Sequence, residues 1–266
     1  MKRIKNSLKT LLAAAALTVA GPVLASGHAL PYTFKPDPSN QASVQRGARN
    51  FMNYCSGCHS MRLLRYSRIA QDLHISEELM QANLMFTSDK PGEHIISSMP
   101  AEASKTWFGQ TPPDLTVETR FRGADWVYNY LLTFYVDPSR PLGTNNLVLP
   151  GASMPHVLAD LQGLQVQKTA EAHEGEHAAE AGEHGAAAAE GHGEEHHGPQ
   201  FEIAVAGKLS PDEYKKFVAD TTNFMVYAAE PGRAQRISTG FKVLLFLLVF
   251  SVLAYFMKRE FWKDVH

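Results

Sequence analysis

The sequence predicts a mainly α-helical domain with long loops, followed by one transmembrane helix near the C-terminus. Three observations support this fold class. The stretch WVYNYLLTFY at 126–135 places aromatic residues and leucines at helical spacing. Proline- and glycine-rich sequence, as at 136–153, indicates long loops. An apolar run at 241–257, extended by 237–240, reaches the roughly 20 residues that cross a bilayer.

The N-terminus has the pattern of a signal peptide. Lys2, Arg3, Lys5 and Lys9 precede an apolar stretch at 11–20. This stretch is short and is followed by Gly21-Pro22, which argues against a membrane anchor. We therefore predict a signal peptide at 1–25, cut after Ala25. The 266 residues and the net charge of −2 fit one domain with appendages.

The C-terminal apolar run is predicted to be a transmembrane helix at 236–257. Lys258, Arg259 and Lys263 follow it, so the positive-inside rule places the tail 258–266 in the cytoplasm. Export of the N-terminus gives the same orientation. A buried core helix is the alternative, but the near-continuous apolar character argues against it. We expect a domain at 26–235 in the periplasm, held at the bacterial inner membrane by a single span.

Within this domain, residues 30–40 are proline-rich and predicted to be extended, and residues 87–114 are predicted to be turn-rich. Ser76 is the expected N-cap of one helix, and Ser210-Pro211 opens another. Besides 126–135, helices are predicted at 42–54, 60–66, 75–84 and from 211 through 227.

Residues 169–200 consist almost entirely of alanine, glutamate, glycine and histidine. Without large apolar side chains, such a segment cannot offset its ordering entropy, so we predict a disordered insertion. Its histidines suggest weak binding of divalent metals, whereas its composition favours a solvated acidic linker. We adopt the linker interpretation.

The motif Cys55-Ser56-Gly57-Cys58-His59 is the spacing used for covalent attachment of a c-type haem. Two thiols one short turn apart reach the two vinyl groups of a porphyrin, and the adjacent His59 provides an iron ligand. The alternative is a thioredoxin-like dithiol, but residues 46–54 read as a helix and no βαβ pattern surrounds the motif. We predict one covalently bound haem c on Cys55 and Cys58, with no cysteine left for a disulfide.

An electron carrier needs a second strong axial ligand, and methionine opposite histidine raises the reduction potential. Met61 is too close to His59 to reach the other haem face. Met99-Pro100 and Met154-Pro155 both lie in predicted loops beside proline, and local chemistry does not separate them. The methionines considered were Met61, Met80, Met85, Met99, Met154 and Met225.

Several stretches, in order along most of the mature chain, resemble the cytochrome c1 family, the haem subunits of the cytochrome bc1 complex. The most specific are TPPDLT at 111–116 and the C-terminal anchor. The others are Arg46-Gly47, CSGCHSMRLLRY at 55–66, DWVYNYLLTFY at 125–135, LPGASMP at 149–155 and AEPGRAQRISTGFK at 228–242.

The resemblance implies a cytochrome c-like haem domain in which Met154, and not Met99, ligates the iron. It also implies that Pro112 and Pro113 pack near the haem and that Arg122 meets a haem propionate. Arg120 is the alternative, because TRFRGADW is one residue shorter than the usual family segment. Two departures from the family are Trp126 in place of tyrosine and the 169–200 tract in place of an acidic, aromatic segment.

The implied function is electron transfer from a Rieske iron–sulfur protein to a soluble or tethered cytochrome c. The implied partners are cytochrome b, the Rieske subunit and the membrane, in a dimeric quinol–cytochrome c reductase. The sequence contains no evident catalytic acid–base set, and we expect no nucleic-acid partner. The alternatives are a haem enzyme with an open iron site, a metal-buffering protein built on the histidine tract, and the haem subunit of another reductase or oxidase.

Overall fold

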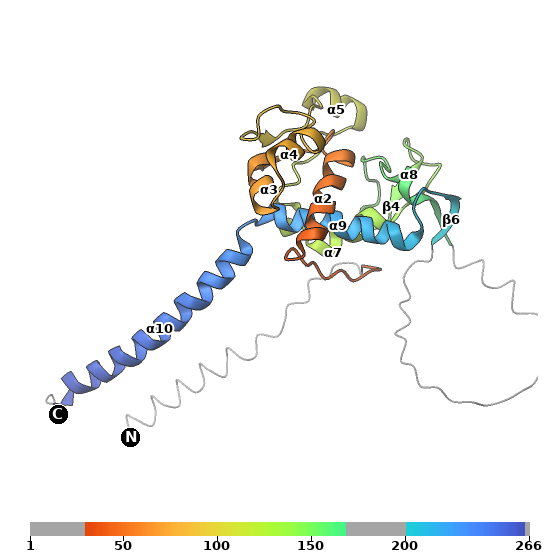
Figure 1. Cartoon of the computed structure of the whole chain (residues 1–266). Coiled ribbons are helices and arrows are strands. Elements are labelled where there is room, and N and C mark those ends of the chain that lie inside the picture. The colour runs from red at the N-terminus through yellow and green to blue at the C-terminus, as the bar shows by residue number, and fades with distance from the viewer. Residues whose placement is uncertain (1–29, 169–200, 264–266) are drawn as a thin grey trace, which may run out of the picture.

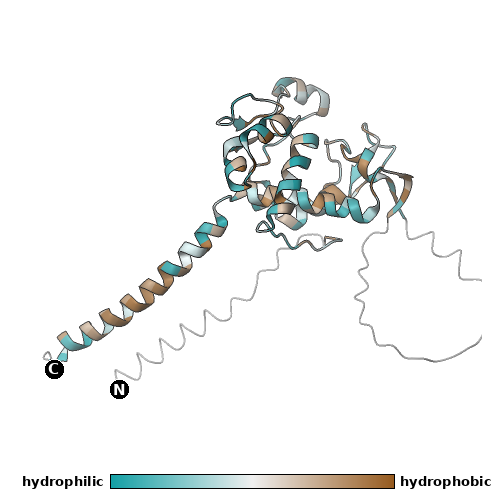
Figure 2. Cartoon of the chain, in the orientation of Figure 1, coloured by the Kyte–Doolittle hydropathy of each residue, from teal (hydrophilic) through white to brown (hydrophobic). Residues whose placement is uncertain are grey.

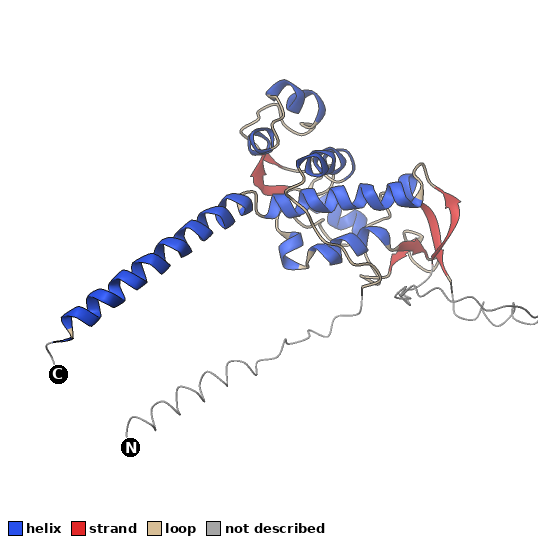
Figure 3. Cartoon of the chain, turned by 60° about the horizontal axis from the view of Figure 1, so that its bottom comes forward, coloured by secondary structure: helices blue, strands red, loops and turns tan. Residues whose placement is uncertain are grey.

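A computed structural model describes residues 30–168 and 201–263, shown in colour in Figure 1. The predicted signal peptide and the predicted disordered insertion at 169–200 lie outside the described residues. The described chain is mainly helical, with long loops and a long C-terminal helix, so the predicted fold class is confirmed. Its small two-stranded sheets lie at the edges of the helical domain (Figure 3).

Two helices from opposite ends of the domain form its centre. They are α2 (Gln41–Tyr54) and α9 (Pro211–Ala229), and both were predicted. They cross at Gly47, where a Cβ atom would lie 2.0 Å from the backbone oxygen of Asp220. The Asp220 carboxylate accepts hydrogen bonds from Ser43 Oγ at 2.5 Å and from Arg46 Nε at 2.6 Å. This close crossing holds the C-terminal end of α2, where the C-x-x-C-H motif begins.

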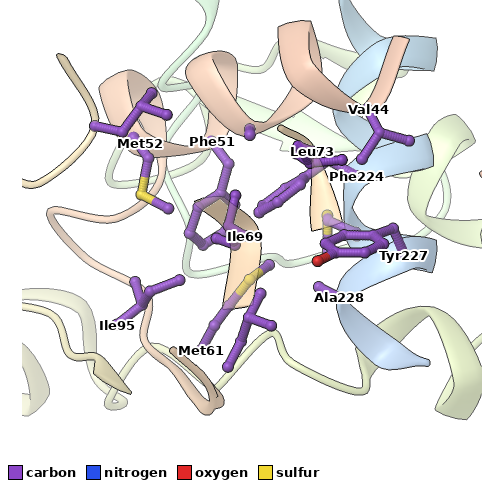
Figure 4. Close-up of a cluster of buried hydrophobic side chains, with 14 of the residues drawn as sticks. Val44, Phe51, Met52, Met61, Ile69, Leu73, Ile95, Phe224, Tyr227 and Ala228 are labelled. Carbon is purple, nitrogen blue, oxygen red and sulfur yellow. The ribbon is translucent and has the colours of Figure 1, made fainter. Parts of the chain in front are cut away.

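The hydrophobic core fills the space beside this crossing (Figure 4). Phe51 of α2 lies against Phe224 of α9, with ring centroids 5.6 Å apart, and both are fully buried. Tyr227 closes one side of the core and donates a hydrogen bond from its hydroxyl to Asp72 at 2.9 Å. Met61, one of the methionines considered as a haem ligand, is fully buried in this core.

The predicted helix at 60–66 is wrong. After the haem motif the chain forms strand β1 (Met61–Arg65), which pairs antiparallel with β2 (His94–Ile95). Its backbone bonds to distant chain and not to itself, because Arg62 N donates to the Asp114 carboxylate at 2.8 Å. Helices α3 (Tyr66–Asp72) and α4 (Glu77–Asn83) follow, and Ser76 caps α4 as predicted.

The stretch 87–114, predicted to be turns, contains a short helix, α5 (Ala101–Phe108). Gly109 ends this helix in the left-handed region, at φ +78°. The sequence gives little warning of α5, because Ser104 is its only buried residue among those that the structure describes. The spacing of apolar residues therefore could not predict this helix.

Helices α6 (Glu118–Phe121) and α7 (Ala124–Leu132) come next. The second of these is the helix predicted at 126–135, and it ends three residues before the predicted end. The Leu132 carbonyl accepts hydrogen bonds from the side-chain amides of Gln162 and Gln165, each at 2.9 Å, in place of a helical partner. The next residues form β3 (Phe134–Val136), paired antiparallel with β4 (Thr144–Asn146) inside the predicted 136–153 loop.

A second hairpin stands at the start of α9. Helix α8 (Ala159–Gln162) leads into β5 (Gly163–Gln167), which pairs antiparallel with β6 (Phe201–Ala206). The register sets Gln167 opposite Phe201. Both ends of the predicted insertion therefore leave the domain from neighbouring positions on one hairpin.

The C-terminal helix α10 (Arg233–Phe261) leaves the domain as a separate rod, as Figures 1 and 2 show. It is long and apolar enough to span a membrane, and its apolar stretch is not buried against the rest of the described protein. Its central turns are predominantly hydrophobic (Figure 2). The helix contains the whole predicted span 236–257, and Lys258 and Arg259 lie in its last turn.

Candidate haem site

A largely apolar cavity of about 480 Å³ lies where the end of α2, helix α7 and the middle of α9 meet. It brings together seven of the eight residues that sequence reasoning singled out, which lie up to 99 positions apart in the chain. These are Cys55, Cys58, His59, Pro112, Pro113, Arg122 and Met154. Arg120, the eighth, is not among the lining residues, and neither is Met99.

The two cysteines sit on a tight turn at the C-terminal end of α2. Backbone hydrogen bonds from Cys58 N and His59 N to the Cys55 carbonyl, at 3.0 and 2.9 Å, close this turn. Burial raises the pKa of the Cys55 thiol to about 12 and also raises the pKa of the Cys58 thiol. A redox-active dithiol needs a lowered thiol pKa, so this environment disfavours the thioredoxin-like alternative.

His59 is held in the orientation that an axial ligand requires. Its Nδ1 lies 2.8 Å from the Pro113 carbonyl oxygen, which can only accept, so Nδ1 carries the proton. Nε2 is then left with a free lone pair beside the cavity. Burial lowers the His59 pKa and keeps the ring neutral, although the hydrogen bond to Pro113 partly opposes this shift. A hydrogen-bonded Nδ1 that orients the ring is the usual support for a metal-binding imidazole.

Met154 reaches the cavity on a loop that two asparagines of β4 support. Asn146 Oδ1 accepts from the backbone N–H groups of Val148 at 2.9 Å and Leu149 at 3.1 Å. Asn145 Oδ1 accepts from Gly151 N at 2.8 Å, where the chain turns at φ +80°. Sequence reasoning missed both asparagines, although adjacent asparagines before a Pro-Gly turn are a sign of side-chain-capped loops.

The two arginines have different surroundings. Arg122 lines the cavity, where its Nε donates to Glu118 at 2.7 Å and its guanidinium lies 4.3 Å from the centre of the Trp126 ring. Arg120 points elsewhere and pairs with Glu230 at 3.7 Å, near the start of α10. Of the two arginines, Arg122 is the one positioned to meet an anionic group in the cavity.

The remaining walls suit a flat, apolar macrocycle. Sequence reasoning did not identify most of them as lining residues, because each is a single apolar position in a helix or loop and no local pattern marks it. They include Phe108, Leu115, Val127, Tyr130, Leu131, Leu149 and Val157. Met225 also lines the cavity, from the buried side of α9. Two thiols, a free imidazole nitrogen, a thioether and a guanidinium among apolar walls are a donor set that fits haem.

A mainly helical domain whose cavity joins a C-x-x-C-H motif to a methionine loop has the features of a c-type cytochrome. A sequence model of the Cytochrome C1 family matches residues 36–180 and 209–265, and the chain belongs to this family. Cytochrome c1 of Allochromatium vinosum is 46% identical over 230 residues, covering 86% of this chain and 87% of that protein.

The chain is also similar to two further proteins. A protein of Nitrosomonas europaea named ammonia monooxygenase gamma subunit is 38% identical over 230 residues, covering 86% of each chain. A chain in a solved structure titled "Hyperthermophilic respiratory Complex III" is 18% identical, with a TM-score of 0.47, over 100% of this chain and 98% of that one.

Proposed function

We propose that this chain is a membrane-anchored monohaem c-type cytochrome of a quinol–cytochrome c reductase. It accepts electrons from a Rieske iron–sulfur protein and passes them to a cytochrome c. The observation that carries the proposal is the cavity that gathers Cys55, Cys58, His59 and Met154 in a chain of the cytochrome c1 family. The match to cytochrome c1 of Allochromatium vinosum over 86% of this chain supports the same role.

In this proposal Cys55 and Cys58 would hold one haem through thioether bonds, and His59 Nε2 and Met154 Sδ would ligate its iron. The haem supplies a one-electron couple, and the protein holds its coordination unchanged between oxidation states. Methionine stabilises the ferrous state and so raises the potential, as an acceptor of Rieske electrons requires. Pro113 orients His59, and Pro112 and the apolar walls exclude water from the ring.

Arg122 is proposed to bind a haem propionate, because it is the arginine on the cavity wall. Its ion pair with Glu118 and its contact with Trp126 restrict the guanidinium before the carboxylate arrives. Arg120 is instead proposed to brace the haem domain on its anchor. Glu230 joins Arg120 of α6 to Arg236 in the first turns of α10.

The membrane topology is also a proposal. Residues 1–25 are a signal peptide, α10 crosses the inner membrane once, and the haem domain lies in the periplasm. The basic residues at the end of α10 support a cytoplasmic C-terminus. The role is electron transfer, so we propose no catalytic acid or base.

The test is gentle solubilisation and purification of the tagged chain from its native membrane. A cytochrome b with two haems and a Rieske protein should co-purify, and quinol should then reduce added cytochrome c. Co-purification with a different oxidase or monooxygenase would contradict the proposed complex. A monooxygenase is a specific alternative to test, because the Nitrosomonas europaea relative is named as a monooxygenase subunit.

Mass spectrometry tests the attachment separately. The mature chain should begin at Ser26 and carry the mass of one haem after denaturation. Replacing Cys55 and Cys58 together should abolish this added mass. Haem that leaves on acid–acetone extraction of the unchanged protein would contradict covalent attachment.

A further inference from the structure

A continuous stack of aromatic rings runs beside the cavity. Trp126 and Tyr130, one helical turn apart on α7, stack with centroids 5.1 Å apart and planes 8° apart. Tyr130 meets Phe134 of β3 edge-on at 5.1 Å. Arg122 covers the other end at 4.3 Å from the Trp126 ring. The stack therefore leads from the proposed propionate site toward the β3–β4 hairpin.

His156 is the last ring of this stack. It lies on Phe134 with centroids 5.0 Å apart and planes only 3° apart. It is also two residues beyond Met154, at the exit of the proposed ligand loop. Phe134 is fully buried, so it offers His156 a fixed surface. The far side of the Met154 loop thus contacts β3 through the rings of His156 and Phe134.

The two ring nitrogens of His156 indicate a second contact that would hold the Met154 loop in place. Both ring nitrogens are buried and have no hydrogen-bond partner of ordinary geometry among the described residues, and the same holds for Gln162 Oε1. The Gly163 backbone and the Gln162 side chain lie beside the ring. A neutral imidazole carries one N–H, which must find an acceptor when it is buried.

Gln162 is oriented to be that acceptor. Its Nε2 donates to the Leu132 carbonyl at 2.9 Å, which fixes the amide and leaves Oε1 turned the other way. The Leu132 carbonyl is itself the end of α7 and also accepts from Gln165. Through Gln162, a hydrogen bond from His156 would attach the Met154 loop to the end of the helix that forms the cavity wall.

We propose that His156 is a positioning residue that holds Met154 over the haem, by stacking on Phe134 and donating a hydrogen bond to Gln162 Oε1. The inference rests on the proposed ligation of the iron by Met154. His156 is not among the residues that line the cavity, so it acts through the loop and touches no haem atom. Its effect is to keep the closed, methionine-ligated form dominant.

Imidazole added to the ferric protein measures this effect, because it binds only when Met154 leaves the iron. The affinity for imidazole rises in proportion to the population of the open loop. The full-length haem protein in detergent is compared with His156→Phe, which keeps the stack, and with His156→Ala, which loses both attachments. Loss of one buried hydrogen bond should tighten imidazole binding about fivefold. Loss of the ring contact as well should tighten it about thirtyfold.

Leu161→Ala is the matched control for general destabilisation. Leu161 is buried in the same short helix as Gln162 and does not line the cavity. Its truncation should lower the melting temperature yet leave imidazole affinity within about twofold. Suppose that Leu161→Ala and His156→Ala lower the melting temperature equally and also tighten imidazole binding equally. The effect is then general and the inference is wrong. Unchanged affinity in both His156 variants would overturn it too.

Met154→Leu separates this inference from the ligand assignment. It should lose the weak near-infrared band of sulfur ligation and bind imidazole more tightly than any His156 variant, because no internal ligand competes. If Met154→Leu keeps the band, the ligand assignment fails, whatever the His156 variants do. If Met154→Leu loses the band and the His156 variants behave like the parent protein, the inference alone fails.

Discussion

Replacing Gly47 by alanine should destabilise the haem domain more than any other single added methyl group at the helix crossing. The new Cβ would lie 2.0 Å from the Asp220 carbonyl oxygen and 2.7 Å from Phe224 Cβ, whereas ordinary contact begins at 3.4 Å. Because the nearest atom is backbone, α2 and α9 must separate by about 1.4 Å, the difference between these two distances. Overpacking of this kind costs up to about 3 kcal/mol.

The separation would also stretch the hydrogen bonds that Ser43 and Arg46 make to Asp220. For a domain of this size, about 3 kcal/mol corresponds to a fall in melting temperature of roughly 6 to 12 °C. The assay is thermal unfolding of the purified haem protein in detergent, followed by circular dichroism. Gly92→Ala is the control, because no atom of the described residues lies within 4 Å of a Cβ there, and it should be neutral or slightly stabilising. If Gly47→Ala melts within 2 °C of the parent, on the order of the smallest significant change, the described crossing is wrong.

Three further predictions concern Tyr214, Tyr130 and the segment 171–198. Tyr214→Phe should cost about 1 to 3 kcal/mol of unfolding free energy in denaturant titration, because it leaves the Leu131 carbonyl without the hydroxyl now bound at 2.8 Å; a neutral result would contradict that buried bond. Burial raises the pKa of Tyr130 to about 12, although Arg122 opposes this shift. The neutral Tyr130 side chain therefore contributes stability that is fully present below pH 10, the ordinary tyrosine value, and that should be lost as pH rises toward 12. Tyr130→Phe should make the fall of melting temperature with pH less steep over that window, and an unchanged slope of melting temperature against pH would refute this prediction. Deleting residues 171–198 should leave the visible spectrum and quinol-dependent cytochrome c reduction nearly intact, since the tract lacks large apolar residues and β5 and β6 already pair at its ends; a large loss of either would make the tract part of the working domain.

The helices that the sequence predicted well are those whose signals are local. Ser210-Pro211 and the apolar face of α9 are enough to place that helix, and a long apolar run is enough to place α10. The element that was predicted wrongly, β1, is set by contacts far along the chain. Its backbone pairs with Asp114 and with β2, and local propensity carries no information about either.

The residues of the candidate site also differ in how well local sequence predicts them. Cys55, Cys58 and His59 form a contiguous motif, so sequence alone located them. Met154 and Met99 are locally equivalent, and only the resemblance to a family separated them. The structure then gives independent grounds, because Met154 lines the cavity and Met99 does not.

Supporting residues were the hardest to anticipate. Asn145, Asn146 and Gln162 act through hydrogen bonds to backbone groups outside their own elements, at separations from 2 to 30 residues. Arg120 and Arg122 are two positions apart, yet one faces the anchor and the other the cavity. Which way each side chain turns depends on the packing of α6 against its neighbours, and the sequence pattern does not record it.

The most direct test of the account is the near-infrared band of the ferric protein that reports sulfur bound to iron. Three variants should be compared: Met154→Leu, Met99→Leu and Met225→Leu, the last because Met225 is the other methionine on the cavity wall. We predict that Met154→Leu loses the band and lowers the reduction potential while the haem stays covalently attached, and that the other two keep it. Loss of the band in Met99→Leu or Met225→Leu, with the band intact in Met154→Leu, would contradict the proposed haem site.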